Sequence, residues 1–113
     1  MGGSGGTSSR PVGQVKRKRV RILSLAQEEI NQAFEWYFKR SPEAADAFLK
    51  EVAASLRQIV SHPQLYPPFT RNTRRRVLPR FPYSVIFREQ DDAILIIALA
   101  HAKRRAGYWS GRT

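Results

Sequence analysis

The stretch FPYSVIFREQDDAILIIALA, residues 81–100, decides the fold that this sequence predicts. Its first half alternates between two sets of side chains, Tyr83, Val85 and Phe87 on one side and Ser84, Ile86 and Arg88 on the other. Such a period of two is typical of a half-buried strand. The run EQDD, residues 89–92, predicts a turn. Residues 93–100 are almost all apolar, which indicates a central strand covered on both faces.

Upstream of this stretch the apolar residues recur at helical spacing. The first predicted helix starts near Ala26 and buries a stripe of six residues, Ala26, Ile30, Ala33, Phe34, Tyr37 and Phe38. Ser41 and Pro42 end that helix and start a second one, because serine caps helices well and proline is favoured at the first helical position. The second helix runs to about Ser61, before the proline of His62-Pro63. So short a link predicts an antiparallel helical hairpin.

Two further strands complete the prediction. Residues 15–25 place Val20 and Ile22 on one face and lead into the first helix, for which Ser24 is the expected N-cap and Glu28 and Glu29 favour the helix dipole. Residues 74–79 form a basic edge strand. The order is β-α-α-β-β-β. We expect an α+β fold, with the helical hairpin packed on a small antiparallel sheet and a basic aromatic tail over residues 103–112.

Composition sets the frame for this fold. The chain has 113 residues with 42% hydrophobic and 26% charged residues and no cysteine, as expected for one globular domain without disulfides or thiol chemistry. Residues 1–14, rich in glycine and serine, are interpreted as a flexible linker or expression segment, and residues 15–113 as the single domain. No secretory signal or membrane segment is predicted, so a cytoplasmic location is expected.

Charge is strongly and unevenly positive. Residues 15–24 carry five basic and no acidic residues, residues 25–60 carry four basic and six acidic, and residues 61–113 carry ten basic and three acidic. The three segments therefore contribute +5, −2 and +7. If the first and last segments lie together, we expect one cationic face that attracts an acidic or phosphate-bearing partner, with the helices left nearly neutral.

Three motifs carry a resemblance to a known family. They are HPQLYP at residues 62–67, FPYSVIFR at residues 81–88, and HAKRRAGYWSGR at residues 101–112. In this order they resemble the RelE/ParE toxin superfamily of type II toxin–antitoxin systems, over about residues 17–112. The resemblance implies a bacterial toxin that is held inactive by a cognate antitoxin, in a possible hetero-oligomer. RelE-like members cut messenger RNA on the ribosome, whereas ParE-like members are associated with poisoning DNA gyrase in plasmid-stabilising modules.

The two activities need different residues. Cleavage of RNA requires proton transfer, for which His101 and Tyr108 are the candidates, and cations to hold phosphate charge. Those cations would be arginines: Arg75, Arg80, Arg88, Arg104 and Arg112. However, His101 is expected to share a strand face with Leu95, Ile97 and Leu99 as a structural histidine. Ala102 stands where some ribosome-dependent members of the superfamily have a tyrosine after the histidine. The sequence therefore favours a ParE-like toxin that binds its target, and leaves enzymatic activity open.

A wider set of residues is predicted to bind the target or the antitoxin: Arg74, Arg75, Arg76, Arg80, Arg88, Arg104, Arg105, Tyr108, Trp109, Arg112 and Trp36. The rings of Tyr108 and Trp109 have two interpretations, as a cover over the open face of the sheet, with Arg112 pinning the tail, or as a platform for a base or target protein. Trp36 falls off the apolar stripe of its helix and suggests a contact surface. No metal or cofactor is predicted, because two distant histidines offer no ligand set. A non-toxic nucleic-acid-binding module remains a third possibility.

Overall fold

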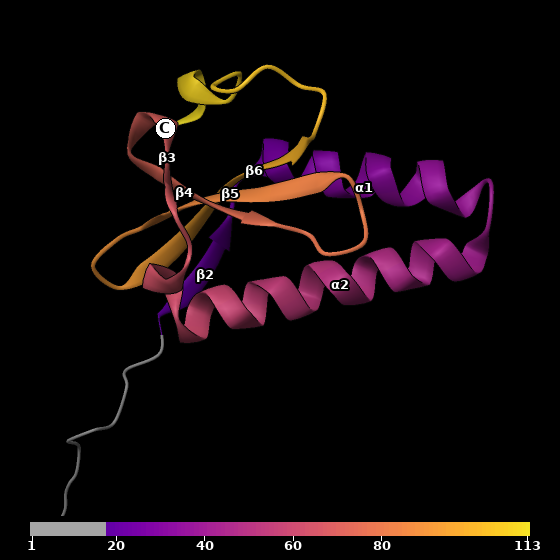
Figure 1. Ribbon diagram of the computed structural model, residues 1–113, viewed down its shortest axis with the longest axis horizontal. Coiled ribbons are helices and arrows are strands. Elements are labelled where there is room, and N and C mark those ends of the chain that lie inside the picture. Colours follow the sequence, from indigo (N-terminus) through magenta and orange to yellow (C-terminus); the bar gives the residue numbers. More distant parts are fainter. Residues whose placement is uncertain (1–17) are drawn as a thin grey trace, which may run out of the picture.

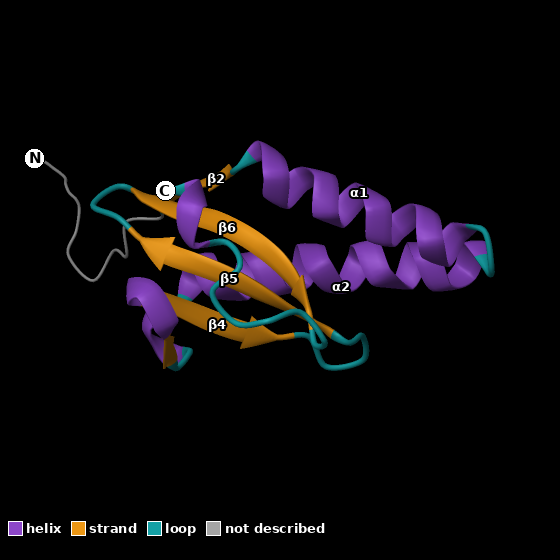
Figure 2. Cartoon of the chain, turned by 90° about the horizontal axis from the view of Figure 1, so that it is seen from above, coloured by secondary structure: helices purple, strands orange, loops and turns teal. Residues whose placement is uncertain are grey.

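Three layers make up the protein. The computed structural model describes residues 18–113, and the predicted linker at residues 1–14 lies outside that range. Two antiparallel helices cover one face of a five-stranded sheet, and residues 102–113, here called the tail, cover the other (Figures 1 and 2). These two faces are called the helix face and the tail face below. The predicted α+β class and helical hairpin are confirmed.

The helices follow the sequence closely. Helix α1 spans Ser24–Phe38 and helix α2 spans Pro42–Ser61. Ser41 caps α2 as predicted, since its Oγ accepts a hydrogen bond from the backbone N–H of Ala44 at 3.2 Å. The predicted N-cap at Ser24 is wrong. Leu23 is the N-cap instead: its backbone is extended, and its N–H still bonds to the carbonyl of Ile96.

The sheet has the order β2-β6-β5-β4-β3. Its strands are β2 (Arg19–Ile22), β3 (Pro68–Phe69), β4 (Thr73–Val77), β5 (Tyr83–Glu89) and β6 (Ala93–His101). Strand β6 is central and buried on both faces, as predicted. The expectation of an antiparallel sheet is wrong for one pair, because β2 runs parallel to β6 while the other pairs are antiparallel. Strand β4 is also not a free edge, since β3 pairs with its first two residues.

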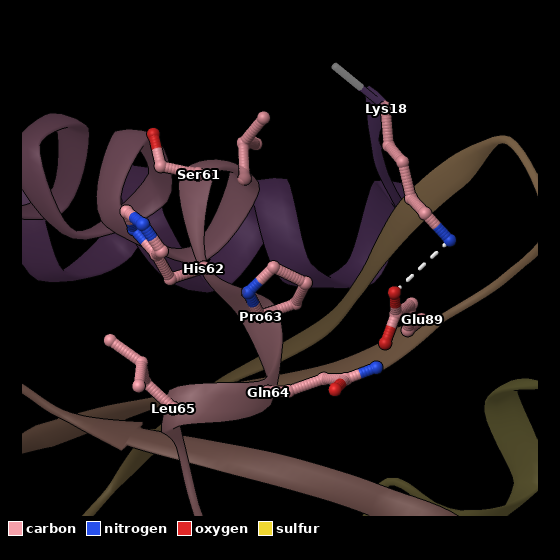
Figure 3. A pocket seen from close by; sticks show the side chains of 8 residues that line it. Lys18, Ser61, His62, Pro63, Gln64, Leu65 and Glu89 are labelled. Carbon is pink, nitrogen blue, oxygen red and sulfur yellow. Dashed lines mark ion pairs between the residues drawn. The ribbon is translucent and has the colours of Figure 1, made fainter. Parts of the chain in front are cut away.

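The helical hairpin explains this parallel pair. Helix α2 has 20 residues against 15 in α1, so it carries the chain back past the start of α1. Its end, at His62 and Pro63, lines a pocket of about 330 Å³ together with Lys18, which directly precedes β2 (Figure 3). An ion pair of 3.1 Å between Lys18 and Glu89 joins β2 to the end of β5 at the same place. The chain therefore enters β4 from the end of the sheet at which β2 begins.

An irregularity in β6 changes which side chains share a face. Ile86 pairs with Ala98 and Phe87 with Ile96, so Ile97 has no partner in β5. Such a bulge reverses the alternation of the strand. Leu95 and Ile97 pack on the tail face, whereas Leu99 packs on the helix face. The prediction that His101 shares a face with Leu95 and Ile97 is therefore wrong, and only Leu99 lies on its side.

Each face of the sheet has its own core. On the helix face Phe48 of α2, Ile30 of α1 and Phe87 pack together, and on the tail face Ile86 packs with Trp109. Ile86 is thus buried, although an alternating half-buried strand was predicted, because the tail covers its side. Neither of the described helices is long and apolar enough to cross a membrane.

Candidate functional site

The tail is fastened to the protein by one carboxylate, that of Glu29 in α1. The Tyr108 hydroxyl donates to Oε2 of Glu29 at 2.6 Å. The Arg112 guanidinium donates to both carboxylate oxygens, at 2.9 Å and 3.0 Å. Such a two-point arginine–carboxylate contact fixes orientation as well as distance. The last residues of the chain are therefore held against the beginning of the helical hairpin.

The side chains of Glu29 and Arg112 also complete the sheet. Strand β2 ends at Ile22, opposite Ile96, so the edge of β6 beyond that point lacks a neighbouring strand. There the backbone N–H of Leu99 donates to Glu29 at 3.0 Å, and Arg112 donates to the carbonyl of Ile97 at 3.0 Å. Because a buried backbone group without a partner is costly, the ion pair satisfies polar groups that a longer β2 would otherwise have paired.

This arrangement keeps both tail side chains protonated. Burial, then the hydrogen bond and the charge of Glu29, raises the pKa of Tyr108 well above its ordinary value of 10.0. The hydrogen bond to Glu29 likewise raises the pKa of Arg112. A tyrosine with so high a pKa, whose hydroxyl already donates a hydrogen bond to a carboxylate, is poorly placed for general acid–base catalysis.

Glu29 was not recognised as a site residue from the sequence. It was interpreted only as favouring the helix dipole. The spacing of Glu29 could have indicated its role. It follows Ala26 by three residues and precedes Ala33 by four, so it lies beside the buried stripe of α1. An acidic residue there must find a cationic or hydrogen-bonding partner.

Trp109 belongs to the core and not to the surface. Its side chain is 3% exposed and stacks on Phe69 with the ring centroids 5.7 Å apart. The prediction that the Trp109 ring offers an exposed platform is therefore wrong, and the alternative, a ring covering the sheet, is correct. Tyr108 is half-buried above it, with the guanidinium of Arg104 lying 3.8 Å from its ring centre.

The predicted cationic residues divide between the two faces. Arg75 lies opposite Ile86 on the tail face, over the ring of Phe69 at 4.3 Å. Its neighbours Arg74 and Arg76 lie on the helix face. There Arg74 donates to the carbonyl of Tyr66 and Arg76 to the side chain of Gln58, each at 2.7 Å. The run of three arginines therefore does not form one cationic face.

Arg80 and Arg88 are also engaged within the protein. Arg80 pairs at 2.9 Å with Glu51, a buried carboxylate of α2 that also accepts the Arg80 backbone N–H. Arg88 donates to the carbonyls of Arg71 and Asn72, which both adopt a left-handed backbone conformation. These two arginines stabilise a loop and a turn, and so are less available to a partner than the sequence suggested.

The proposed RNA-cleaving residues come together only in part, because His101 and Arg104 line one small pocket whereas Arg80 lies elsewhere. His101 lies at the end of β6, where its Nδ1 accepts the N–H of Lys103 at 3.0 Å and its ring meets Tyr83 edge-on. This is the structural role that the sequence favoured. Tyr108 is bound to Glu29, and Arg80 is held by Glu51 on the helix face. Of the four candidates, Arg104 contacts two others: its guanidinium stacks on the ring of Tyr108, and its backbone N–H donates to the carbonyl of His101 at 2.9 Å.

Trp36 is isolated from the tail. It lies in the last turn of α1. That end of α1 forms the tip of the hairpin, remote from the C-terminus (Figure 2). Its side chain is 51% exposed, and the guanidinium of Arg40 lies 3.7 Å from the ring centre. Trp36 is thus an exposed aromatic side chain that is separate from the tail, so the alternative that Trp36 packs against the tail is wrong.

Comparisons with known proteins agree with this fold. A solved structure described as "Chromosomal ParDE TA system from P. aeruginosa" superposes with a TM-score of 0.69 over 79% of this chain and 100% of that chain, at 16% identity. "Toxin ParE2" from Mycobacterium tuberculosis, strains CDC 1551 and H37Rv, is 28% identical over 85 residues, 74% of this chain and 81% of the relative. The model of the family "ParE toxin of type II toxin-antitoxin system, parDE" matches residues 20–106.

The class of protein is therefore the toxin of a type II toxin–antitoxin system. Within that class the chain belongs to the ParE toxin family. The match runs from residue 20 to residue 106, so it includes the hairpin and all of the sheet except Arg19, but not the Tyr108–Arg112 segment that Glu29 holds.

Proposed function

We propose that this ParE-family toxin acts by binding DNA gyrase and trapping it on DNA, and that a cognate antitoxin neutralises it in a cytoplasmic toxin–antitoxin complex. The observation that carries the proposal is the Glu29–Tyr108 hydrogen bond. It commits the best proton-transfer candidate of the tail to a structural contact. A surface that only binds its target needs no proton transfer, whereas a nuclease needs a free group to transfer a proton.

Two surfaces support binding to other proteins. The tail carries Lys103, Arg104 and Arg105, which are all exposed. Exposed apolar side chains lie along the helical hairpin, at Leu25, Trp36, Phe38 and Leu49. Trp36 and Phe38 both belong to the last turn of α1, and exposed tryptophans are enriched in protein interfaces. The hairpin therefore suits an antitoxin segment, and the basic tail suits an enzyme engaged with DNA.

A supercoiling assay tests the proposed target. Purified toxin at micromolar concentration should inhibit gyrase, and Arg105→Gln should weaken this inhibition because it removes an exposed tail charge. The matched control is Arg57→Gln, which removes an exposed charge from α2 and should inhibit as the unchanged protein does. Full gyrase activity in the presence of toxin, together with cleavage of ribosome-bound message, would overturn the proposal.

A growth assay separates binding from catalysis. Inducing the toxin without its antitoxin should stop growth, and His101→Ala should remain toxic, since the imidazole of His101 is engaged in structural contacts with Tyr83 and the Lys103 backbone. Loss of toxicity by a folded His101→Ala protein would instead favour the messenger RNA endoribonuclease. Unchanged growth on induction of the original chain would favour a non-toxic nucleic-acid-binding module.

A further inference from the structure

A small pocket opens on the tail face between β4, β5 and the tail. Its volume is about 210 Å³, and its walls include Phe69, Arg75, Ser84, Ile86, Arg104 and Trp109. Pockets for drug-sized molecules measure roughly 300–1,000 Å³. This one is smaller, so it suits a single chemical group on a larger ligand.

Two arginines of this pocket are positioned but unpaired. Arg75 lies over Phe69 at 4.3 Å and Arg104 over Tyr108 at 3.8 Å. Stacking on a ring fixes the plane of a guanidinium while leaving the N–H groups at its edge free to donate. Within residues 18–113 neither arginine forms an ion pair or a side-chain hydrogen bond, although Arg19, Arg80 and Arg112 all have carboxylate partners.

Buried donors at the same place also lack acceptors. Nε of Arg75 and the indole Nε1 of Trp109 are inaccessible to solvent and have no hydrogen-bond partner in the described part of the chain. Trp109 itself is almost fully buried. Native proteins rarely leave such groups unsatisfied, and exceptions call for an explanation such as a bound ion. Both of these groups are donors, so the missing partner is a hydrogen-bond acceptor; Nε of Arg76, on the helix face, is unpaired in the same way.

The charge around the pocket selects the kind of acceptor. No carboxylate lines it. Lys103 and Arg105 are exposed on either side of Arg104 in the chain. A pocket for one anionic group with further cations beside one of its ligands matches a chain of evenly spaced charges, as in a nucleic-acid backbone.

We propose that this pocket binds a phosphate group of a nucleic-acid strand, with Arg75 and Arg104 as its two charged ligands. The inference concerns binding alone and involves no cleavage. It holds whether or not gyrase is the target, because the ligand is recognised by its phosphate. In a toxin that traps an enzyme on DNA, such a pocket would hold the DNA strand beside the enzyme.

The two tryptophans provide an internal control for the first experiment. Trp109 lines the pocket, whereas Trp36 lies at the hairpin tip, and the chain has no others. In ¹H–¹⁵N spectra, inorganic phosphate, and more strongly a twelve-residue oligothymidylate, should shift the indole cross-peak of Trp109 and leave that of Trp36 in place. Absence of any shift at Trp109, or equal shifts at both, would overturn the proposal.

Charge-matched variants provide the second experiment. Arg75→Gln and Arg104→Gln should each weaken binding of the labelled oligothymidylate about tenfold and lower the slope of log affinity against log salt by about 0.7, as expected for one lost phosphate contact to a single strand. Arg57→Gln, which removes the same charge from α2, should change affinity by less than about twofold. So small a change is the effect of lowering the net charge of the protein without removing a phosphate ligand. An equal loss with Arg57→Gln would mean nonspecific attraction and would overturn the assignment.

A third experiment distinguishes a nucleic-acid ligand from an acidic peptide. A twelve-residue polyglutamate peptide carries a similar number of charges but presents carboxylates. It should compete for the pocket at least about tenfold less well than the oligothymidylate, since its charges are not spaced as phosphates are. If it binds more tightly and shifts Trp109 equally, the pocket docks an acidic peptide and the nucleic-acid assignment is wrong.

Discussion

The Tyr108 hydroxyl lies 2.6 Å from Oε2 of Glu29, across a separation of 79 residues in the chain. Because Arg112 contacts the same carboxylate, one acidic side chain holds three structural parts together: the tail, α1 and the unpaired edge of β6. No other acidic residue in the described part of the chain accepts hydrogen bonds or ion pairs from as many different residues. Changes to this contact therefore give the sharpest tests of the structure.

Glu29→Gln should destabilise the protein by about 3 kcal/mol. The substitution keeps the size of the side chain but leaves the partly buried guanidinium of Arg112 without its counter-charge, which is costly. Urea unfolding followed by circular dichroism measures the change. Glu28→Gln is the control, because Glu28 is exposed and its loss should cost less than about 0.5 kcal/mol. Equal stability of the two variants would contradict the role given to Glu29.

Stability should fall above pH 10 in part because of Tyr108. Its pKa is raised in the folded protein from the ordinary value of 10.0, so above that pH the unfolded chain releases this proton first and is stabilised relative to the fold. Below pH 10 the contribution is fully present. Absorbance at 295 nm follows tyrosinate formation. Burial also raises the pKa of Tyr37 and Tyr83, so the difference between the original protein and Tyr108→Phe isolates Tyr108.

That difference spectrum should titrate later than free tyrosine. A difference centred near pH 10 would show that the Tyr108 hydroxyl is solvated and not held by Glu29.

Trp109→Ala should cost about 3–5 kcal/mol, the usual range for truncating a buried tryptophan. Trp36→Ala should cost less than about 1 kcal/mol, because Trp36 is half exposed and contacts mainly Arg40. Thermal unfolding gives both values. The Trp36→Ala protein retains only Trp109, so its fluorescence should be blue-shifted, as for a buried indole. A red-shifted emission would mean that the tail is detached in solution.

Glu51→Gln should destabilise the fold by about 2 kcal/mol, since Glu51 is buried and its carboxylate accepts two hydrogen bonds from Arg80. Arg80→Gln should cost about 1 kcal/mol or less, because the Arg80 side chain is largely exposed. Combining the two changes measures their coupling by a double-mutant cycle. Strictly additive costs would show that the observed ion pair contributes nothing.

The sequence predicted the parts of the fold that depend on local chemistry. Ser41 and Pro42 defined the junction between the helices, and the apolar run at residues 93–100 identified the central strand, because capping, proline geometry and periodicity are all read from neighbouring residues. The direction of β2 was not predictable in this way. It depends on α2 being longer than α1 and so returning the chain to Lys18, a relation between distant residues.

The candidate site was less accessible to sequence reasoning for two physical reasons. The bulge at Ile97 reverses the faces of β6, but both faces of that strand are apolar, so alternation of side chains could not reveal it. Exposure of the arginines could not be judged either. Arg80, Arg88 and Arg112 are bound by Glu51, by turn carbonyls and by Glu29, and each of these partners is distant in sequence.

The position of Arg112 has a consequence for synthesis of the protein. The edge of β6 is completed by the penultimate residue of the chain, and β6 itself is the strand on which both cores are built. While residues 93–112 are still enclosed by the ribosome, neither core can close around that strand. Strand β2 and helix α1, which emerge earlier, therefore remain without the strand against which they pack until those residues are free.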